Sequence, residues 1–168
     1  MPQTILIRPT TAADVPAVDA LLARAYPRLL KGGYPPSVLV TAVPIISRAR
    51  PELLASGTYY LAEDAAGRVL GAAGWTRAGP SGEAARGGRA HVRHVATDPA
   101  HARQGIGRRL MGHVLAEARA GGVTRLDCLA TLPAVPFYAA LGFEALGPGE
   151  VPLRPGIALA VERMRRTL

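Results

Sequence analysis

The sequence TDPAHARQGIGR, from Thr97 to Arg108, joins a predicted strand to a predicted helix. The first backbone N–H groups of a helix lack partners within it, and the helix dipole adds partial positive charge there. Because Gly105 and Gly107 have no Cβ, a phosphate group can approach this backbone closely. Arg103 and Arg108 can add charge-assisted hydrogen bonds. The stretch therefore predicts an anion site that suits a pyrophosphate.

Two common phosphate motifs do not fit this stretch. No Gly-Lys-Ser/Thr follows the glycines, so it is not a Walker loop. Leu110 stands where a dinucleotide fingerprint needs its third small residue. A Gly-x-Gly by itself also occurs in ordinary strand-to-helix turns, so the interpretation depends on a second motif.

That second motif is AVPFYAALGF, from Ala134 to Phe143, and it completes a resemblance to the GCN5-related N-acetyltransferase (GNAT) superfamily. The stretch is similar to the family signature A-x-x-F-Y-x-x-x-G-F. Thr131 stands three residues before it, where the family often has Asn. The two motifs are separated by the length of one helix and one strand, as in the family.

The glycine stretch is similar to the family's pyrophosphate loop, which reads Arg/Gln-x-x-Gly-x-Gly/Ala. Asp98-Pro99 matches the phrase that precedes this loop, and Ala102 replaces the usual Arg or Gln. We expect Arg103 and Gln104 to supply the missing charge and hydrogen bond. The resemblance extends more loosely to Ile7-Arg8-Pro9 and Asp14, which look like a common family opening.

The resemblance implies acetyl-CoA as co-substrate. Its pantetheine arm would lie along the predicted strand 89–97 like an added strand, and its pyrophosphate would lie on the glycine loop. The cofactor-binding residues expected from the resemblance are Val95, Ala96, Thr97, Arg103, Gln104, Gly105, Ile106, Gly107, Arg108, Thr131 and Tyr138.

Two catalytic residues are expected. Tyr138 matches the tyrosine that often protonates the departing sulfur in the family, although a half-buried core tyrosine is the alternative. His91 is the candidate base, because residues 91, 93, 95 and 97 are expected to share one face of their strand. His94 would lie on the opposite face, and a purely structural role for His91 stays open. Glu63 is a weaker candidate for the base.

Other titratable groups are expected to have no catalytic role. His101 and His113 are predicted to lie on solvated surfaces. No histidine is accompanied by the further ligand residues that a metal site needs, so no metal is expected. Cys128 is the single cysteine and lies in an apolar run, which favours a buried core position over a nucleophile. Without a credible nucleophile, we expect direct transfer in a ternary complex.

The remaining pattern predicts an α/β (α+β) fold of the GNAT type, with one domain over residues 1–168. The resemblance implies a mixed sheet of about six to seven strands, about four helices, and a V-shaped splay between the fourth and fifth strands. Pro27 is expected to end the first helix. Strands are expected over 4–9, 57–63, 68–76, 89–97, 124–130, 143–146 and 157–164, and helices over about 11–27, 37–48, 105–120 and 133–141.

Composition narrows the classes of function without choosing one. The chain has 168 residues, a formal net charge of +8 and 49% hydrophobic residues. No apolar run approaches the roughly 20 residues of a membrane helix, and no signal peptide is seen, so a cytoplasmic protein without a membrane partner is expected. The charge keeps a nucleic-acid-binding module as a rival, but aromatics are only 5% and no nucleic-acid motif appears, so no specific nucleic acid is expected.

The acceptor is the least defined part. A small-molecule or peptide amine is expected as the acceptor. We expect Tyr26, Tyr34 and Trp75 to line its binding site, with Tyr59 as a further aromatic candidate; packing in the core is the alternative for each. A non-catalytic acyl-CoA sensor of the same fold stays open. A homodimer is also possible by family resemblance.

Overall fold

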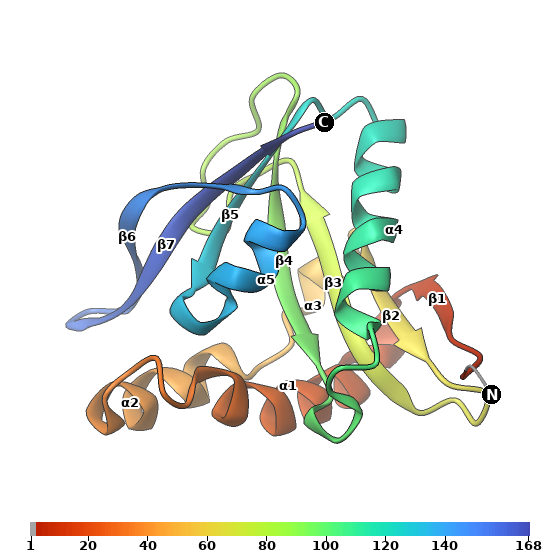
Figure 1. Cartoon of the computed structure of the whole chain (residues 1–168), viewed down its shortest axis with the longest axis horizontal. Helices are drawn as coiled ribbons and strands as arrows, with labels where there is room; N and C mark the ends of the chain where they lie inside the picture. Colours follow the sequence, from red (N-terminus) through yellow and green to blue (C-terminus); the bar gives the residue numbers. More distant parts are fainter. Residues whose placement is uncertain (1–2) are drawn as a thin grey trace.

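One mixed sheet organises residues 3–168, the part of the chain that this computed structural model describes (Figure 1). Its seven strands run in the order β1-β2-β3-β4-β5-β7-β6, and the β4–β5 pair is parallel whereas every other pair is antiparallel. The strands are β1 (Leu6–Pro9), β2 (Tyr59–Glu63), β3 (Val69–Thr76), β4 (Arg89–Thr97), β5 (Arg125–Thr131), β6 (Glu144–Arg154) and β7 (Ile157–Thr167).

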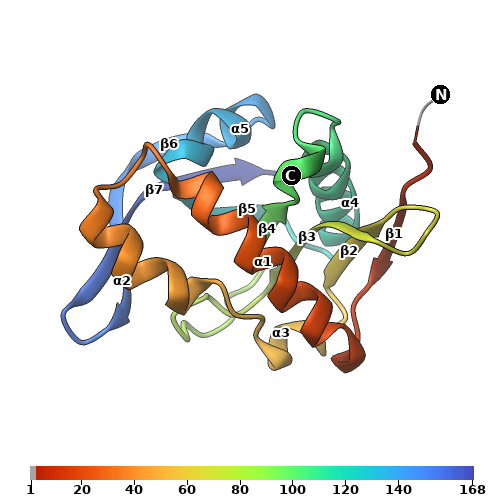
Figure 2. The same cartoon turned by 90° about the horizontal axis from the view of Figure 1, so that it is seen from below.

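Helices cover both faces of the sheet. They are α1 (Val15–Leu30), α2 (Pro36–Ile46), α3 (Pro51–Leu54), α4 (Ile106–Ala120) and α5 (Val135–Ala140), with 3₁₀ turns at Ala12–Asp14, Pro99–His101 and Leu132–Ala134. Figure 2 shows α4 and α5 on one side of the sheet and α1 to α3 on the other. The largest core cluster fills the α4 side, where Leu110, Met111 and Val114 pack on the strands, and α1 and α2 bury two smaller clusters on the other side. Among the described residues, none of the helices combines the length and apolarity that crossing a membrane requires.

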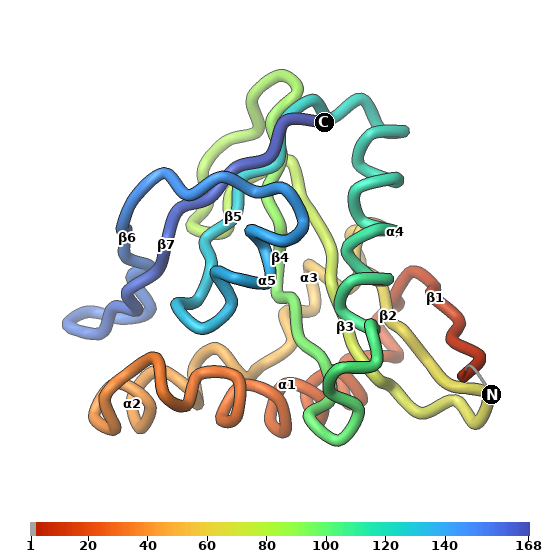
Figure 3. Tube along the Cα trace, viewed as in Figure 1, coloured from red at the N-terminus to blue at the C-terminus, as the bar shows by residue number. Residues whose placement is uncertain are grey.

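The central strands β4 and β5 pair over a short distance only. Their register covers Arg89↔Arg125, Ala90↔Leu126 and His91↔Asp127, and beyond this point the two strands diverge (Figure 3). We call this divergence the fork and its paired end the apex. The fork is the V-shaped splay that the family resemblance implies, and α5 and the start of α4 lie beside it (Figure 1).

A bulge in β4 lies inside the fork. Gly74 pairs with Arg93 and Ala72 pairs with Ala96, so two residues of β4, His94 and Val95, stand opposite one residue of β3. His94 has a φ of 42°, and its carbonyl accepts a hydrogen bond of 2.7 Å from the Tyr59 hydroxyl. The bulge leaves backbone groups of the fork outside the β3–β4 ladder.

The bulge corrects one expectation about β4. An added residue reverses the alternation of side chains, so residues 91, 93, 95 and 97 do not share a face. His91 and Arg93 alternate with Ala90 and Val92, which belong to the core under α4, so they lie on the α1 side. Thr97, in contrast, packs toward α4, close to Gly107. The sequence pattern missed this because a strict period of two assumes a regular ladder.

Two further expectations are wrong for local reasons. Helix α1 does not end at Pro27 but continues to Leu30. Proline displaces the carbonyl four residues earlier, and Ala23 is exposed, so water can satisfy that group, while Tyr26 and Leu30 anchor the last turn in the core. The closing strands are also longer than predicted and form a hairpin of eleven residues each, with prolines on the edge strand β6, where a missing donor is tolerated.

Candidate functional site

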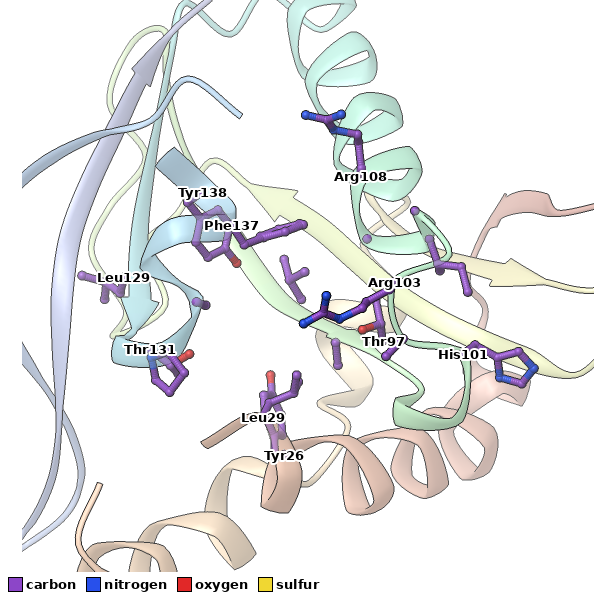
Figure 4. A pocket seen from close by; sticks show the side chains of 18 residues that line it. Tyr26, Leu29, Thr97, His101, Arg103, Arg108, Leu129, Thr131, Phe137 and Tyr138 are labelled. Carbon is purple, nitrogen blue, oxygen red and sulfur yellow. The ribbon is translucent and has the colours of Figure 1, made fainter. Parts of the chain in front are cut away.

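A cavity of about 510 Å³ fills the open end of the fork. Figure 4 shows side chains from both strands, α4, α5 and α1 pointing toward it. Its lining residues are Tyr26, Leu29, Val95, Ala96, Thr97, His101, Ala102, Arg103, Gly105, Ile106, Gly107, Arg108, Leu129, Thr131, Pro133, Ala134, Phe137 and Tyr138. Every expected cofactor-binding residue except the exposed Gln104 is among them.

The start of α4 forms one wall of this cavity. Gly105 has a φ of 76°, a conformation that favours glycine, and helical bonding begins with Arg109 N–H donating to the Gly105 carbonyl at 3.0 Å. A Cβ at Gly107 would lie 3.2 Å from the Phe137 ring and 3.3 Å from the Thr97 methyl. The N–H groups of the first turn therefore border the cavity at a point where a side chain larger than that of Gly107 would crowd Phe137 and Thr97.

The two arginines of this wall point in different directions. Figure 4 shows the Arg103 guanidinium reaching into the cavity, whereas the Arg108 side chain runs along α4. The preceding turn is fixed by Asp98, whose carboxylate accepts a 2.9 Å hydrogen bond from Ala100 N–H and pairs with Arg24 at 3.1 Å. The wall is therefore positively charged and held by a capped turn.

Tyr138 forms the opposite wall, from α5. Its ring is only 6% exposed and makes edge contacts with Phe137 and Phe143, and Figure 4 shows its hydroxyl directed into the cavity. Burial raises its pKa well above the ordinary value, so the phenol keeps its proton near neutral pH. Buried Cys128 lies close to it, and burial raises the pKa of that thiol to about 12. A neutral, enclosed thiol is a poor nucleophile.

The histidines of β4 lie outside the cavity lining. His91 is at the apex, opposite Asp127, and lines a second hollow of about 250 Å³ on the α1 side of the sheet. Burial lowers the pKa of His91, so its neutral form persists to lower pH. Burial also lowers the pKa of His94 to about 4, and its Nδ1 is buried without a partner beside Tyr26. Glu63 is bound to Arg8 at 2.6 Å on the far edge of the sheet.

The three aromatic residues expected at the acceptor site have different surroundings. Tyr26 lines the cavity, and Figure 4 shows its hydroxyl pointing in from α1. Tyr34 is nearby but structural: its hydroxyl donates to the Ala160 carbonyl at 2.6 Å and accepts from Leu132 N–H at 3.0 Å. Trp75 belongs to the core under α4 and does not line the cavity.

Leu29 and His101 line the cavity, although the sequence pattern does not predict this. Leu29 reaches the cavity because α1 continues past Pro27, and the apolar spacing from Leu22 through Tyr26 to Leu29 is the signal that shows it. His101 was expected on a solvated surface but is partly buried at the rim, with its ring turned away in Figure 4. His113, expected in a similar place, packs against Tyr60 with ring centroids 4.5 Å apart.

The side chains of residues 3–168 offer no cluster of three His, Cys, Asp or Glu groups suited to a metal ion. The cavity lining also contains no Asp or Glu. What the cavity offers is backbone N–H groups, an arginine and a protonated phenol around a largely apolar interior. Such a set can bind a phosphate at one end and donate a proton at the other.

The sequence profile of the Acetyltransferase (GNAT) family matches residues 23–143. No curated protein shows significant sequence similarity.

Solved structures share the fold. A GCN5-related N-acetyltransferase from Rhodopseudomonas palustris superposes with a TM-score of 0.76 at 20% identity, over 100% of this chain and 98% of the other. The PaiA N-acetyltransferase from Thermoplasma acidophilum in complex with coenzyme A gives 0.68 at 12% identity, over 98% and 99%. A GNAT family acetyltransferase from Brucella melitensis in complex with acetyl-CoA gives 0.61 at 23% identity, over 85% and 84%.

Proposed function

This chain belongs to the GNAT acetyltransferase family, and from that premise we propose that it transfers an acetyl group from acetyl-CoA to a primary amine. The observation that carries the proposal is the cavity in the fork, which places the start of α4 and the Tyr138 hydroxyl on opposite walls of one space. The first wall would bind the pyrophosphate at one end of acetyl-CoA, and the second would protonate the thiolate that leaves at the other end.

Acetyl-CoA fits this space by its chemistry. Its pyrophosphate would be held by the first-turn N–H groups of α4 and by Arg103, which matches anion to dipole and charge. Backbone groups of β4 left unpaired by the bulge and the fork would hold the amides of its arm, from Val95 to Thr97. The thioester would then lie near Tyr138.

The protein residues would act as follows. Tyr138 gives its proton to the sulfur as the C–S bond breaks, which is possible because burial keeps the phenol protonated. His91, neutral at the apex of the fork, receives the proton that the amine loses as its nitrogen forms the amide bond. The acceptor approaches from the α1 side, where His91 lies, and transfer is direct in a ternary complex. One domain of this fold would cover residues 1–168, and both walls belong to its described part, residues 3–168.

A second candidate is a non-catalytic acyl-CoA sensor. The observation that favours it is the absence of any Asp or Glu among the described residues that line the cavity, so a carboxylate base is not at hand. In that case binding of acetyl-CoA would persist without turnover.

An acetylation assay with Tyr138→Phe separates the two candidates. Thiol release from acetyl-CoA is measured with a panel of primary amines, at saturating acetyl-CoA. We expect amine-dependent turnover in the wild-type protein and a loss of about 10²-fold in kcat for Tyr138→Phe, with acetyl-CoA affinity retained, because only proton donation is removed. The matched control is Tyr34→Phe, which removes a hydroxyl that bonds only to backbone. Equal kcat for Tyr138→Phe and wild type would contradict the acid role, and acetyl-CoA binding without turnover on any amine would favour the sensor.

A further inference from the structure

The cavity in the fork is lined from both faces of the sheet. Tyr138 lines it from α5 on one face, and Tyr26 and Leu29 line it from α1 on the other. Figure 4 shows the hydroxyls of Tyr26 and Tyr138 pointing into it from opposite walls. Because acetyl-CoA would occupy the space between the start of α4 and Tyr138, the acceptor amine would meet its thioester from the α1 side.

The α1 side of the cavity is apolar. Four lining residues, which we call the acceptor wall, belong to this side: Tyr26, Leu29, Leu129 and Pro133. Leu129 faces α1 because it alternates with Cys128 and Ala130, which belong to the core under α4. Leu29 is 37% exposed and Leu129 is 36% exposed, so both offer apolar surface to a ligand. Leu129 also lines the hollow beside His91, so the wall extends from the cavity toward the proposed base.

The corner between α1 and α2 holds the acceptor wall in place. A Cβ on Gly33 would collide with the Pro133 ring, so the backbone of this corner lies directly on the wall. The Tyr34 hydroxyl ties the same corner to the sheet, because it donates to the Ala160 carbonyl at 2.6 Å and accepts from Leu132 N–H at 3.0 Å. An apolar surface that is already in place binds a ligand with little cost for ordering its own side chains.

The acceptor wall offers no carboxylate to a cation. Among residues 3–168, neither Asp nor Glu lines the cavity, whereas Arg103 points into it. The hollow beside His91 contains two carboxylates, and both already have partners. Asp127 lies 3.3 Å from guanidinium nitrogens of three arginines, and Glu83 accepts a 2.9 Å hydrogen bond from Ser81 N–H. An ammonium group placed at the wall would therefore lose water and gain no counter-ion.

We propose that the acceptor is a primary amine with an apolar body and no second positive charge, and that this body packs on the acceptor wall. The proposal rests on the proposed acetyl transfer and names the class of its acceptor, hydrophobic monoamines. The amine nitrogen forms the amide bond to the acetyl carbon as the C–S bond breaks. The proton that the amine loses passes to His91, and Tyr138 gives a proton to the thiolate. The wall is unchanged by these steps and holds the amino group near the thioester.

The first test compares acceptors on the wild-type protein at saturating acetyl-CoA and equal concentrations of free amino groups. Hexylamine, 1,6-diaminohexane and 6-aminohexanoate have similar lengths and end in a methyl group, an ammonium and a carboxylate. We expect kcat/KM at least tenfold higher for hexylamine than for either charged acceptor, because a charge at the wall would lose its hydration. We also expect at least a tenfold advantage of hexylamine over ethylamine, since each buried methylene group contributes a factor of about three to four.

Three results of this comparison would overturn the inference while leaving acetyl transfer intact. One is equal kcat/KM for ethylamine and hexylamine, and another is a preference for either charged acceptor. The third comes from hexanoyl-CoA: faster transfer from hexanoyl-CoA to ethylamine than from acetyl-CoA to hexylamine would assign the wall to the acyl chain. Failure of the wild-type protein to bind acetyl-CoA would instead remove the proposed function itself.

The second test places a carboxylate on the acceptor wall. Leu29→Asp gives a second ammonium group a counter-ion, so we expect the ratio of kcat/KM for 1,6-diaminohexane to that for hexylamine to rise at least tenfold. The matched control is Val40→Asp, the same change of charge at a 75% exposed position on α2 that does not line the cavity, where the ratio should stay at its wild-type value.

Leu29→Ala removes apolar surface without adding charge. We expect it to lower the ratio of kcat/KM for hexylamine to that for ethylamine about threefold or more. Thermal unfolding of each variant checks that it is folded. Wild-type ratios in both Leu29 variants would refute the role of the acceptor wall.

Discussion

His91 is placed by two residue-level facts. It is the last residue of β4 to pair with β5, and it stands opposite Asp127, whose charge acts against the effect of burial on its pKa. Burial is the larger effect and lowers the pKa of His91. The neutral imidazole, which can act as a base, therefore still predominates when the pH is somewhat below the ordinary histidine pKa of about 6.5. A base at this position would therefore work throughout the neutral range.

A pH profile tests that role. If His91 accepts the amine's proton, kcat/KM calculated for free amine is constant near neutral pH and falls as pH drops through the lowered pKa of His91, because the protonated ring cannot accept. We expect His91→Gln to lower the rate about 10²-fold near pH 7 and to abolish this acid limb. His113→Gln, a partly buried histidine on α4, is the matched control. An unaltered rate and profile in His91→Gln would leave the histidine with a structural role only.

At the scale of elements, α4 and the bulged strand β4 shape the cavity together. Gly107 packs so closely on Phe137 and Thr97 that a methyl group there would lie in contact with both at 3.2–3.3 Å, whereas a Cβ on Gly112, five residues along the same helix, would meet nothing within 4 Å. The same substitution at the two positions therefore separates helix propensity from cavity shape.

We expect Gly107→Ala to weaken acetyl-CoA binding about tenfold or more, because its neighbours must shift by a few tenths of an ångström into the cavity. Gly112→Ala should leave binding unchanged and raise stability by about 0.5–1 kcal/mol, because alanine is the better helix former. Thermal unfolding with and without acetyl-CoA measures both effects. Wild-type affinity in Gly107→Ala would show that the start of α4 is not a wall of the acetyl-CoA site.

At the same scale, some parts of the fold and of the candidate site are predictable from the sequence and others are not. The glycine loop, the strand before it and the α5 motif were predicted from local patterns, and the structure brings their residues to one cavity because they adjoin the fork. The bulge at His94 was not predictable from alternation, since one extra residue changes the face of every residue after it. The sequence does not predict the lining role of Leu29 as long as Pro27 is expected to end the helix, because Leu29 then lies outside it.

At the scale of the whole molecule, charge is the least specific feature. The net charge of +8 would attract any polyanion, including nucleic acid and the phosphates of acetyl-CoA. The structure shows where part of this positive charge lies. The start of α4 and Arg103 direct positive charge into the fork, and other arginines lie together at its apex. A general basic surface and a shaped anion site differ in stoichiometry and in salt dependence.

The most direct test of the account is a calorimetric titration of the protein with acetyl-CoA at physiological salt, beside ATP and a short DNA duplex. We predict saturable binding of one acetyl-CoA per chain, weaker binding of ATP, and only weak, salt-sensitive heat from DNA. Saturable binding of DNA with no response to acetyl-CoA would contradict the assignment of the fork as an acetyl-CoA site.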